Sequence, residues 1–378
     1  MNPVRQSVSN LWNHFQHNLF PWLEEELGPL SKKQQKLIQV FELTDLDSHI
    51  PYSGRGKGRP PSNRAAILRA FIAKAVYDFT TTEVLLDHLQ GSKTLRRLCG
   101  WEKASDIPSA STFSRAFAEF SRTQLAESLH AKIIEDYLSD QFAGHISRDS
   151  TAISAREKPV KKEQLEQKKK PRGRPKKGEE RVKEPTRIER QIDGMSLEEM
   201  KADLPVSCDV GTKMNSKGYK TSWIGYKLHI DTMDGGIPIS CLLTSASVHD
   251  SQVAIPLAKL SASRITSCYD LMDSAYDSPL IKQHSRSLGH VPIIDHNPRN
   301  KDAKKAIEVE KLAQRKAGFK YPEVIRYNER STVERVNGRL KDEFGGRHLR
   351  VKGQAKVMTH LMLGVVVLIS DQLMRIIV

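Results

Sequence analysis

The sequence predicts an α/β protein in which an all-helical, helix-turn-helix-like N-terminal domain precedes a mixed sheet with flanking helices. Apolar residues recur at three- and four-residue spacing through much of the first 140 residues, which is the period of amphipathic helices. Alternating and short apolar runs bounded by turn residues then take over, which is typical of strands. A length of 378 residues suggests two or three domains. We therefore place a helical domain at residues 1–140 and a sheet-containing domain at residues 141–378.

Four short helices are predicted between residues 61 and 121. Each has apolar residues on one face, namely Ile67, Leu68, Phe71, Ile72, Ala75 and Val76; Leu85, Leu86 and Leu89; Leu95, Leu98 and Trp101; and Phe113, Phe117 and Phe120. Short helices joined by tight turns resemble a helix-turn-helix region, so we expect this domain to bind DNA. A small bundle that only packs is the alternative.

The sheet-containing domain has five predicted strands, at residues 142–153, 219–232, 237–244, 267–272 and 291–294. The second and third flank Asp234-Gly235-Gly236, a strong hairpin turn. Two helices, at about 329–344 and 355–377, follow, and the second is most simply a core helix. The run Cys208–Thr212 and the Lys-, Arg- and Asn-rich segment after residue 294 are predicted to be loops.

Charge and composition exclude several classes of protein. The chain has 60 Lys and Arg against 45 Asp and Glu, a net charge of +15, which favours a polyanionic partner such as nucleic acid. The longest uninterrupted apolar run, Leu361–Ile369, is far shorter than the roughly 20 residues of a membrane span. The four cysteines form no CxxC pair, which argues against a zinc knuckle. We therefore expect a cytoplasmic protein with no membrane partner.

A basic insertion is predicted at about residues 155–203. Residues 156–190 hold 15 Lys or Arg and 7 Glu with almost no apolar residues, so we expect this segment to be disordered or extended. Within it, Pro171–Lys177 resembles an AT-hook, whose Arg172, Arg174 and Lys176 would enter a narrow A·T minor groove. The alternative is a solvated basic linker held near DNA by charge alone.

The sharpest chemical signal is a set of four residues near the C-terminus. Tyr327, Arg330, Glu334 and Lys341 are spaced by 3, 4 and 7 residues, which places them on one face of an α-helix. A carboxylate that binds a metal, beside cations that bind phosphate, suits phosphodiester chemistry. The alternative is an exposed helix with ion pairs between residues i and i+4, such as Arg330 with Glu334.

Two aspartates on predicted strands complete the candidate site. Asp149 lies on the first strand, and Asp273 ends an apolar strand, where a carboxylate is costly to bury unless it is paired or binds a cation. The alternative for Asp273 is a helix cap. Three carboxylates on separate elements of one sheet can hold two divalent cations, and Mg²⁺ prefers such oxygen ligands. Less favoured candidates are Asp209, Asp250, Asp270 and Asp277.

On these residues the chain resembles the bacterial insertion-sequence transposases, which have a DDE triad in an RNase H-like catalytic domain. The closest group carries a Tyr-x2-Arg-x3-Glu-x6-Lys signature, which residues 327–341 match at every position. Asp149 in Arg-Asp-Ser-Thr and Asp273 in Asp-Ser-Ala-Tyr resemble the first two acids of the triad. The segment Ser245–Asp250 also resembles a recurring family segment. The likeness covers about residues 60–120 and 142–375.

The resemblance implies a role for each of these residues. Asp149, Asp273 and Glu334 would bind two Mg²⁺ ions, for which Mn²⁺ can substitute. A DNA strand would be cut at the transposon's terminal inverted repeats, and the freed 3′-OH would attack target DNA. Arg330 and Lys341 would hold phosphates, with Tyr327 packing or bonding beside them.

The resemblance also implies a homodimer on the transposon ends and association with the bacterial nucleoid. The alternatives are a metal-dependent nuclease without strand transfer and a non-enzymatic DNA-binding repressor derived from a transposase.

The AT-hook hypothesis predicts a base-composition effect. Deleting residues 168–177 should weaken binding to A·T-rich duplexes more than to G·C-rich duplexes, because only the former offer a narrow minor groove. Fluorescence anisotropy with matched duplexes would measure this, and an equal loss on both would reject the hook.

Overall fold

A computed structural model of the chain describes residues 3–50, 62–160, 184–214, 218–296, 298 and 300–376. The AT-hook-like segment, with Arg172, Arg174 and Lys176, lies outside the described residues.

The N-terminal region is helical, as the sequence predicts. Its elements are α1 (Pro3–His14), a π-helix (Phe15–Leu19), α2 (Phe20–Leu27), α3 (Lys32–Thr44), α4 (Arg64–Val76), α5 (Thr82–Gly91), α6 (Lys93–Cys99), α7 (Ala110–Arg122) and α8 (Leu125–Leu138). Local capping explains several boundaries. The side chains of Asn63, Thr81 and Ser92 accept backbone hydrogen bonds at the starts of α4, α5 and α6. Gly100, with φ of 102°, ends α6 in a left-handed conformation.

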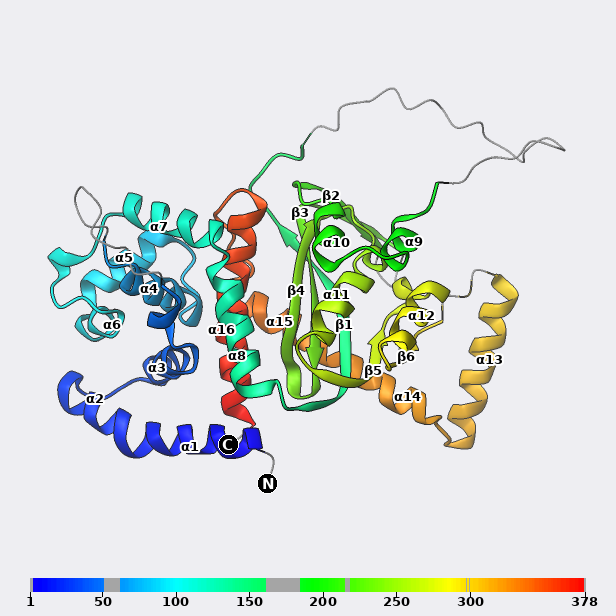
Figure 1. Cartoon of the computed structure of the whole chain (residues 1–378), viewed down its shortest axis with the longest axis horizontal. Helices are drawn as coiled ribbons and strands as arrows, with labels where there is room; N and C mark the ends of the chain where they lie inside the picture. Colours follow the sequence, from blue (N-terminus) through cyan, green and yellow to red (C-terminus); the bar gives the residue numbers. More distant parts are fainter. Residues whose placement is uncertain are drawn as a thin grey trace.

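A mixed six-stranded sheet forms the second part of the fold (Figure 1). Its strands are β1 (Phe142–Ser154), β2 (Asp209–Met214), β3 (Lys220–Met233), β4 (Ile237–Ser245), β5 (Thr266–Met272) and β6 (Val291–Ile294). Strand β3 is antiparallel to β1, β2 and β4, whereas β1, β5 and β6 are parallel. This mixed sheet behind a helical region is the predicted fold class, and it is consistent with an RNase H-like domain.

Helices cover both faces of the sheet. On one side are α9 (Arg187–Ile192), α10 (Leu197–Asp203), α11 (Ala254–Ala262) and α12 (Pro279–Ser287). On the other are α15 (Ser331–Glu343), which contacts β1 and β3, and α16 (Gln354–Arg375), which contacts β4. Between these groups in sequence come α13 (Lys301–Ala317) and α14 (Pro322–Tyr327), at the far edge in Figure 1.

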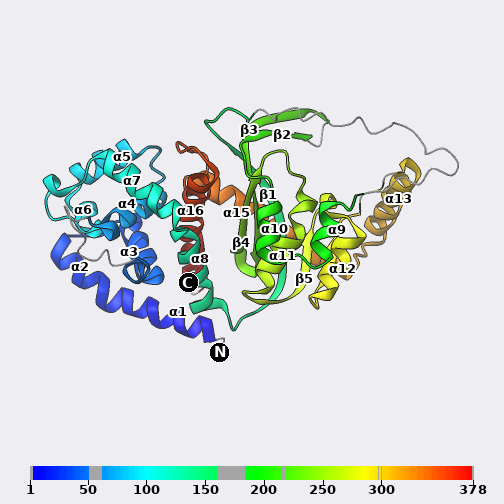
Figure 2. The same cartoon turned by 45° about the horizontal axis from the view of Figure 1, so that its top comes forward.

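Two segments predicted to be loops are regular structure instead. The run Cys208–Thr212 lies mostly in β2, which pairs with the first part of β3 in a hairpin that extends beyond the main sheet (Figure 2). Tertiary pairing, not an apolar run, makes this short polar segment a strand. Helix α13 lies within the segment after residue 294 that was predicted to be a loop; its sequence is rich in Ala, Lys, Glu and Gln, which are strong helix formers.

The end of the predicted disordered insertion is also ordered. Helices α9 and α10 each begin with a capping box, formed by Thr186 with Glu189 and by Ser196 with Glu199. Gln191 and Met200 are buried, so these helices pack onto the sheet-containing domain. The expectation of disorder up to residue 203 was therefore wrong for residues 187–203, where short polar helices are fixed by caps and a few buried contacts.

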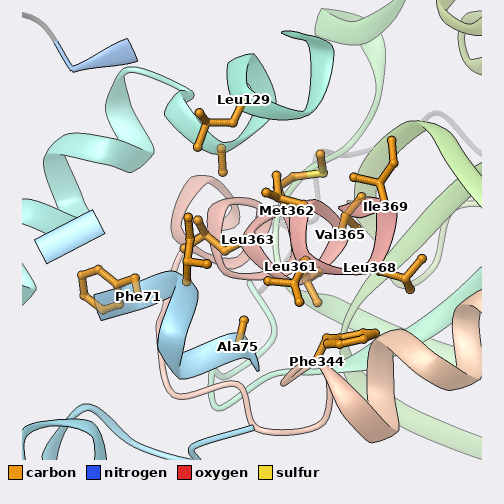
Figure 3. Close-up of a cluster of buried hydrophobic side chains, with 14 of the residues drawn as sticks. Phe71, Ala75, Leu129, Phe344, Leu361, Met362, Leu363, Val365, Leu368 and Ile369 are labelled. Atoms are coloured by element: carbon orange, nitrogen blue, oxygen red, sulfur yellow. The ribbon is translucent and has the colours of Figure 1, made fainter. Parts of the chain in front are cut away.

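Helix α16 is the core helix that the sequence predicts. It is long and apolar enough to span a membrane, but 89% of its most apolar window is buried inside the protein. It packs against α3, α4, α7 and α8 on one side and against β4 on the other. Figure 3 shows its side chains between Phe71 and Leu129 of the helical region and Phe344 after α15. One hydrophobic core therefore runs through both regions, and a domain boundary at residue 140 stays a prediction.

A buried ion pair fixes the centre of the sheet. Arg148 on β1 is 1% exposed and Asp231 on β3 is fully buried. Two parallel bonds join them, from Nε to Oδ1 at 2.8 Å and from Nη2 to Oδ2 at 2.7 Å. The hydroxyl of Ser261 on α11 donates a further bond to Asp231 Oδ2, at 2.6 Å. The pair therefore joins two strands to the helix that covers them.

Removing one partner of this pair should destabilise the fold strongly. Arg148→Met would leave the Asp231 carboxylate buried without its counter-charge, at a cost of about 3–5 kcal/mol in the free energy of unfolding. Urea unfolding followed by circular dichroism would measure it. The double variant Arg148→Met/Asp231→Leu should recover much of the loss, and a double variant as unstable as the single one would contradict this account.

Candidate active site

Asp149 lies on the face of the sheet that α15 covers. Its neighbour Arg148 points the other way, toward α11, because successive side chains of a strand alternate between faces. Ser147, on the same face as Asp149, donates a hydrogen bond from Oγ to the carbonyl oxygen of Glu329 at 3.3 Å. This contact places the β1 face that bears Asp149 beside the chain that leads into α15.

Asp273 follows the end of β5, the strand next to β1. Its Oδ1 accepts a hydrogen bond from the backbone N–H of Ala275 at 3.0 Å, so it caps the short 3₁₀ helix Ser274–Tyr276. Asp273 therefore does act as a helix cap, as the alternative predicted, but the cap uses only one of its two carboxylate oxygens. Parallel strands β1 and β5 pair Arg148 with Met272, so Asp149 and Asp273 each follow one member of a paired position. The charge of Asp273 acts on Asp149.

The four-residue motif is not carried by one continuous α-helix. Tyr327 ends α14, Arg330 ends a 3₁₀ turn (Asn328–Arg330), and Glu334 and Lys341 lie on α15. The backbone stays right-handed through the junctions, so the pieces continue one another. The Arg330 guanidinium lies 5.8 Å from the centre of the Tyr327 ring.

One guanidinium faces all three candidate carboxylates. Arg330 is ion-paired and hydrogen-bonded to Glu334. Its charge also acts on Asp149 and Asp273, where it opposes the rise in the pKa of each carboxyl that burial causes. Arg330 therefore interacts with all three acids, with Glu334 by direct contact and with the two aspartates through its charge.

Burial dominates the acid–base behaviour of the two aspartates. It raises the pKa of Asp149 to about 6; the charge of Asp273 adds to this, while the Ser150 N–H and the charges of Arg330 and Lys213 oppose it. Burial also raises the pKa of Asp273, with a further contribution from the charge of Asp250. A bound cation would favour the ionised form of both carboxylates and so would offset the effect of burial on their pKa values.

Lys341 and Lys213 extend the positive side of the site. Burial is the main cause that lowers the pKa of Lys341, with the charges of Arg347 and Lys213 adding to it and that of Asp149 opposing it. Lys213 is exposed on β2, and its charge acts on both Asp149 and Asp273. No sequence pattern pointed to Lys213, which lies on β2 directly after the run Cys208–Thr212 that was predicted to be a loop.

A polar cluster around Asp250 interacts with the candidate site, since the charge of Asp250 acts on Asp273. Lys227 Nζ donates to Asp250 Oδ1 at 2.9 Å and to the carbonyl oxygen of Val248 at 2.8 Å. The Tyr276 hydroxyl is buried, and it has no hydrogen-bond partner within the described residues. The charges of Asp250, Asp149 and Asp273 all raise the pKa of Tyr276, after burial. Tyr276 and Asp250 therefore border the site, which the sequence signalled only through the Ser245–Asp250 segment and the Asp-Ser-Ala-Tyr motif.

The less favoured aspartates have other partners. Asp270 is 1% exposed and pairs with His290 at 3.3 Å. Asp277 pairs with Lys282 and His296, and Asp209 accepts a hydrogen bond from Ser247. His249 caps the 3₁₀ helix Asp250–Gln252.

The donor set fits a hard divalent cation. Carboxylate oxygens are the ligands that Mg²⁺ prefers, and the raised pKa values of Asp149 and Asp273 indicate carboxylates in need of counter-charge. Among the residues that the structure describes, no three His, Cys, Asp or Glu side chains are close enough to form a metal cluster. Holding an ion with all three acids would require Glu334 to release Arg330.

Comparison with known proteins decides the family. Residues 141–369, more than half of the chain, match the family described as "Transposase DDE domain". The chain belongs to this DDE transposase family. Residues 24–119 also match the family described as "Transposase domain (DUF772)". The predicted family is thereby confirmed, whereas the Tyr-Arg-Glu-Lys signature and the site residues stay predictions.

Similar curated proteins include the probable transposases for insertion sequence element ISH11 from two strains of Halobacterium salinarum. They are 29% identical over 156 residues, which is 39% of this chain and 47% of each relative. The chain thus spans about half the length of the curated relatives it matches. No solved protein structure matches it.

The raised pKa of Asp149 predicts that ionising this carboxyl lowers the free energy of unfolding of the domain as the pH rises. The folded state holds the Asp149 proton up to about pH 6, above the ordinary value of 3.8, so its contribution to stability is lost as pH rises through that window. In EDTA, Asp149→Asn should therefore be more stable than the wild type at neutral pH, by about 1–3 kcal/mol, and nearly equal at pH about 4.

Urea unfolding at the two pH values would measure this difference. Asp87→Asn, an exposed position on α5, is the matched control and should show no such pH-dependent gain. If Asp149→Asn were no more stable than the wild type at neutral pH, the ionised Asp149 carboxylate would not destabilise the fold, contrary to the prediction.

Proposed function

We propose that this chain is a DNA transposase that cuts DNA at transposon ends and transfers the freed 3′-OH to target DNA. One observation supports the proposal: within a domain of the DDE transposase family, the guanidinium of Arg330 is ion-paired with Glu334 and its charge acts on both Asp149 and Asp273. The excess of positive charge in the chain is consistent with a DNA substrate.

In the proposed reaction, two phosphoryl transfers follow one another. A water oxygen bonds to phosphorus at the transposon end while the bond from phosphorus to the 3′-oxygen breaks, which leaves a 3′-OH and a 5′-phosphate. That 3′-OH then bonds to phosphorus in target DNA, and the target's own 3′-oxygen leaves. Neither step needs an oxidant or a nucleotide cofactor.

The three carboxylates are proposed to hold two Mg²⁺ ions, or Mn²⁺ in their place. Bound ions would supply the Lewis acidity that activates a water and stabilises the departing oxygen. Asp149 and Asp273 would approach them from neighbouring strands, and Glu334 from α15. The fixed strands and the helix would hold these oxygens without reorganisation at the moment of reaction.

The cations have a separate proposed task. Arg330, Lys341 and Lys213 would bind phosphate oxygens, so that the phosphodiester lies beside the carboxylates. Tyr327, stacked near Arg330, would limit the positions that this guanidinium can take. Arg172, Arg174 and Lys176 are proposed to add minor-groove contacts.

The DNA partners would be the terminal inverted repeats and the target. We propose that two copies of the chain act together on the paired ends, in association with the bacterial nucleoid.

The function can be tested on plasmid DNA that carries the gene with its flanks. Purified protein with Mg²⁺ or Mn²⁺ should cleave at the element's ends and yield joined products. Glu334→Gln should lower this activity by at least about 100-fold, because it removes a ligand charge and leaves the shape unchanged. Glu323→Gln, an exposed acid on α14, is the matched control and should retain activity.

Other outcomes would select the alternatives. Nicking at unrelated positions without joining would indicate a nuclease. Tight DNA binding with no metal-dependent cleavage by either protein would indicate a DNA-binding repressor derived from a transposase.

A further inference from the structure

A basic cleft of about 530 Å³ lies where the helical region meets the segment that joins α15 to α16. Phe71 and Phe117 of α4 and α7 supply apolar wall, opposite Phe344 and Leu363, and Figure 3 labels three of these residues. The cationic side chains that line the cleft are Lys74, Arg156, Arg350, Lys352 and Lys356, with His348 beside them. Among the described lining residues, Glu83 is the only acid.

Lys74 is the unusual member of this set. It lies in the last turn of α4 and is only 8% exposed. Within the described part of the chain, its Nζ forms no ion pair or hydrogen bond. Burial lowers the pKa of Lys74 to about 8, the charge of Arg350 lowers it further, and that of Asp78 opposes them. A largely buried lysine whose ammonium has no ion pair or hydrogen bond among the described residues costs stability, and an anionic ligand in the cleft would offset that cost.

Among the described residues, the other cations of the cleft have no ion-pair partner either. None of Arg156, Arg350, Lys352 and Lys356 forms an ion pair with a described residue. The cleft therefore presents several uncompensated positive charges to whatever enters it. His360 adds no charge at neutral pH, because burial lowers its pKa to about 4, and it instead binds the carbonyl oxygen of Gly345 at 2.9 Å.

Positive side chains connect this cleft to the candidate active site. The charges of Asp149 and Arg347 both act on Lys341, and Arg347 is itself ion-paired with Asp342. Arg347 directly precedes His348 in the cleft wall, and Arg156 follows the end of β1, the strand that carries Asp149. A row of charges that leads away from the carboxylates suits a polymer of phosphates better than a small anion, which would occupy only one end.

We propose that this basic cleft binds backbone phosphates of the same DNA whose phosphodiester lies at the carboxylates. The choice of DNA rests on the proposed function, whereas the anionic character of the ligand rests on the cleft alone. Because its walls come from α4, α7 and the segment after α15, DNA bound there would clamp the helical region against the catalytic helix.

The test uses the full chain and a fluorescent duplex that carries the element's end, in EDTA so that no cleavage occurs. Lys74→Met and Arg350→Ala should each weaken binding about threefold to tenfold at physiological salt. Each should also reduce the slope of log affinity against log salt by about 0.9, the value for one lost phosphate contact. Lys132→Met, an exposed lysine on α8 outside the cleft, is the matched control and should change neither quantity.

Thermal unfolding separates this effect from misfolding. Lys74→Met should unfold at the same temperature as the wild type or higher, because it removes a buried unpaired charge. Weaker DNA binding with undiminished stability would support the cleft. Affinities and salt slopes equal to those of the control would overturn the proposal, as would stabilisation by inorganic phosphate alone with DNA binding unchanged in the variants.

The two proposals can fail separately. If the wild type binds DNA through the cleft but never cleaves it with Mg²⁺ or Mn²⁺, the proposed catalytic function fails and the cleft stands. If the wild type transposes and both cleft variants bind and transpose as well as Lys132→Met, the cleft assignment fails and the function stands.

Discussion

The buried ion pair of Arg148 and Asp231 sets the register on which the candidate site depends. A slip of one residue between β1 and β3 would send every side chain of β1 to the opposite face. Such a slip would separate Arg148 from Asp231 in the interior and would also carry Asp149 away from α15. Arg148, which fixes the strand, and Asp149, which would take part in the chemistry, are therefore sequence neighbours whose side chains point to opposite faces of the sheet. Because breaking the Arg148–Asp231 pair is costly, the pair also holds Asp149 in position.

The candidate site combines excess negative and excess positive charge at close range. The charge of Asp273 raises the proton affinity of Asp149, that of Asp250 raises the proton affinity of Asp273, and Arg330 offsets only part of each effect. Lys213 and Lys341 approach from β2 and from the later part of α15. In this arrangement neither the carboxylates nor the cationic side chains are fully neutralised. Divalent cations bound to the carboxylates and phosphates bound to the Lys and Arg side chains would neutralise both, and a nucleic-acid phosphodiester with divalent metal would provide this combination.

Local signals explain what could be predicted from the sequence. The helical periodicity around Phe71, the alternation of β3 and the Asp-Gly-Gly turn are set by nearby residues, and the structure confirms those elements. The neighbourhood of Asp149 and Asp273 follows from two parallel strands. By contrast, β2 depends on pairing with β3, so Lys213 was missed, and α9 and α10 are held by capping boxes within a segment whose overall charge suggested disorder. The cleft around Lys74 joins segments almost 300 residues apart, which no local pattern could indicate.

The position of α16 has a consequence for how such proteins diversify. The helix follows the candidate catalytic residues in the chain, yet it completes the interior of the helical region that precedes them. A recombination event that replaced only residues 1–140 with those of a relative would bring in helices shaped for a different α16. The region expected to recognise DNA ends and the region expected to cut them must therefore be inherited together, or the incoming helices must be repacked against the resident one. New end specificities should then arise by surface substitution within the helical region more readily than by its exchange.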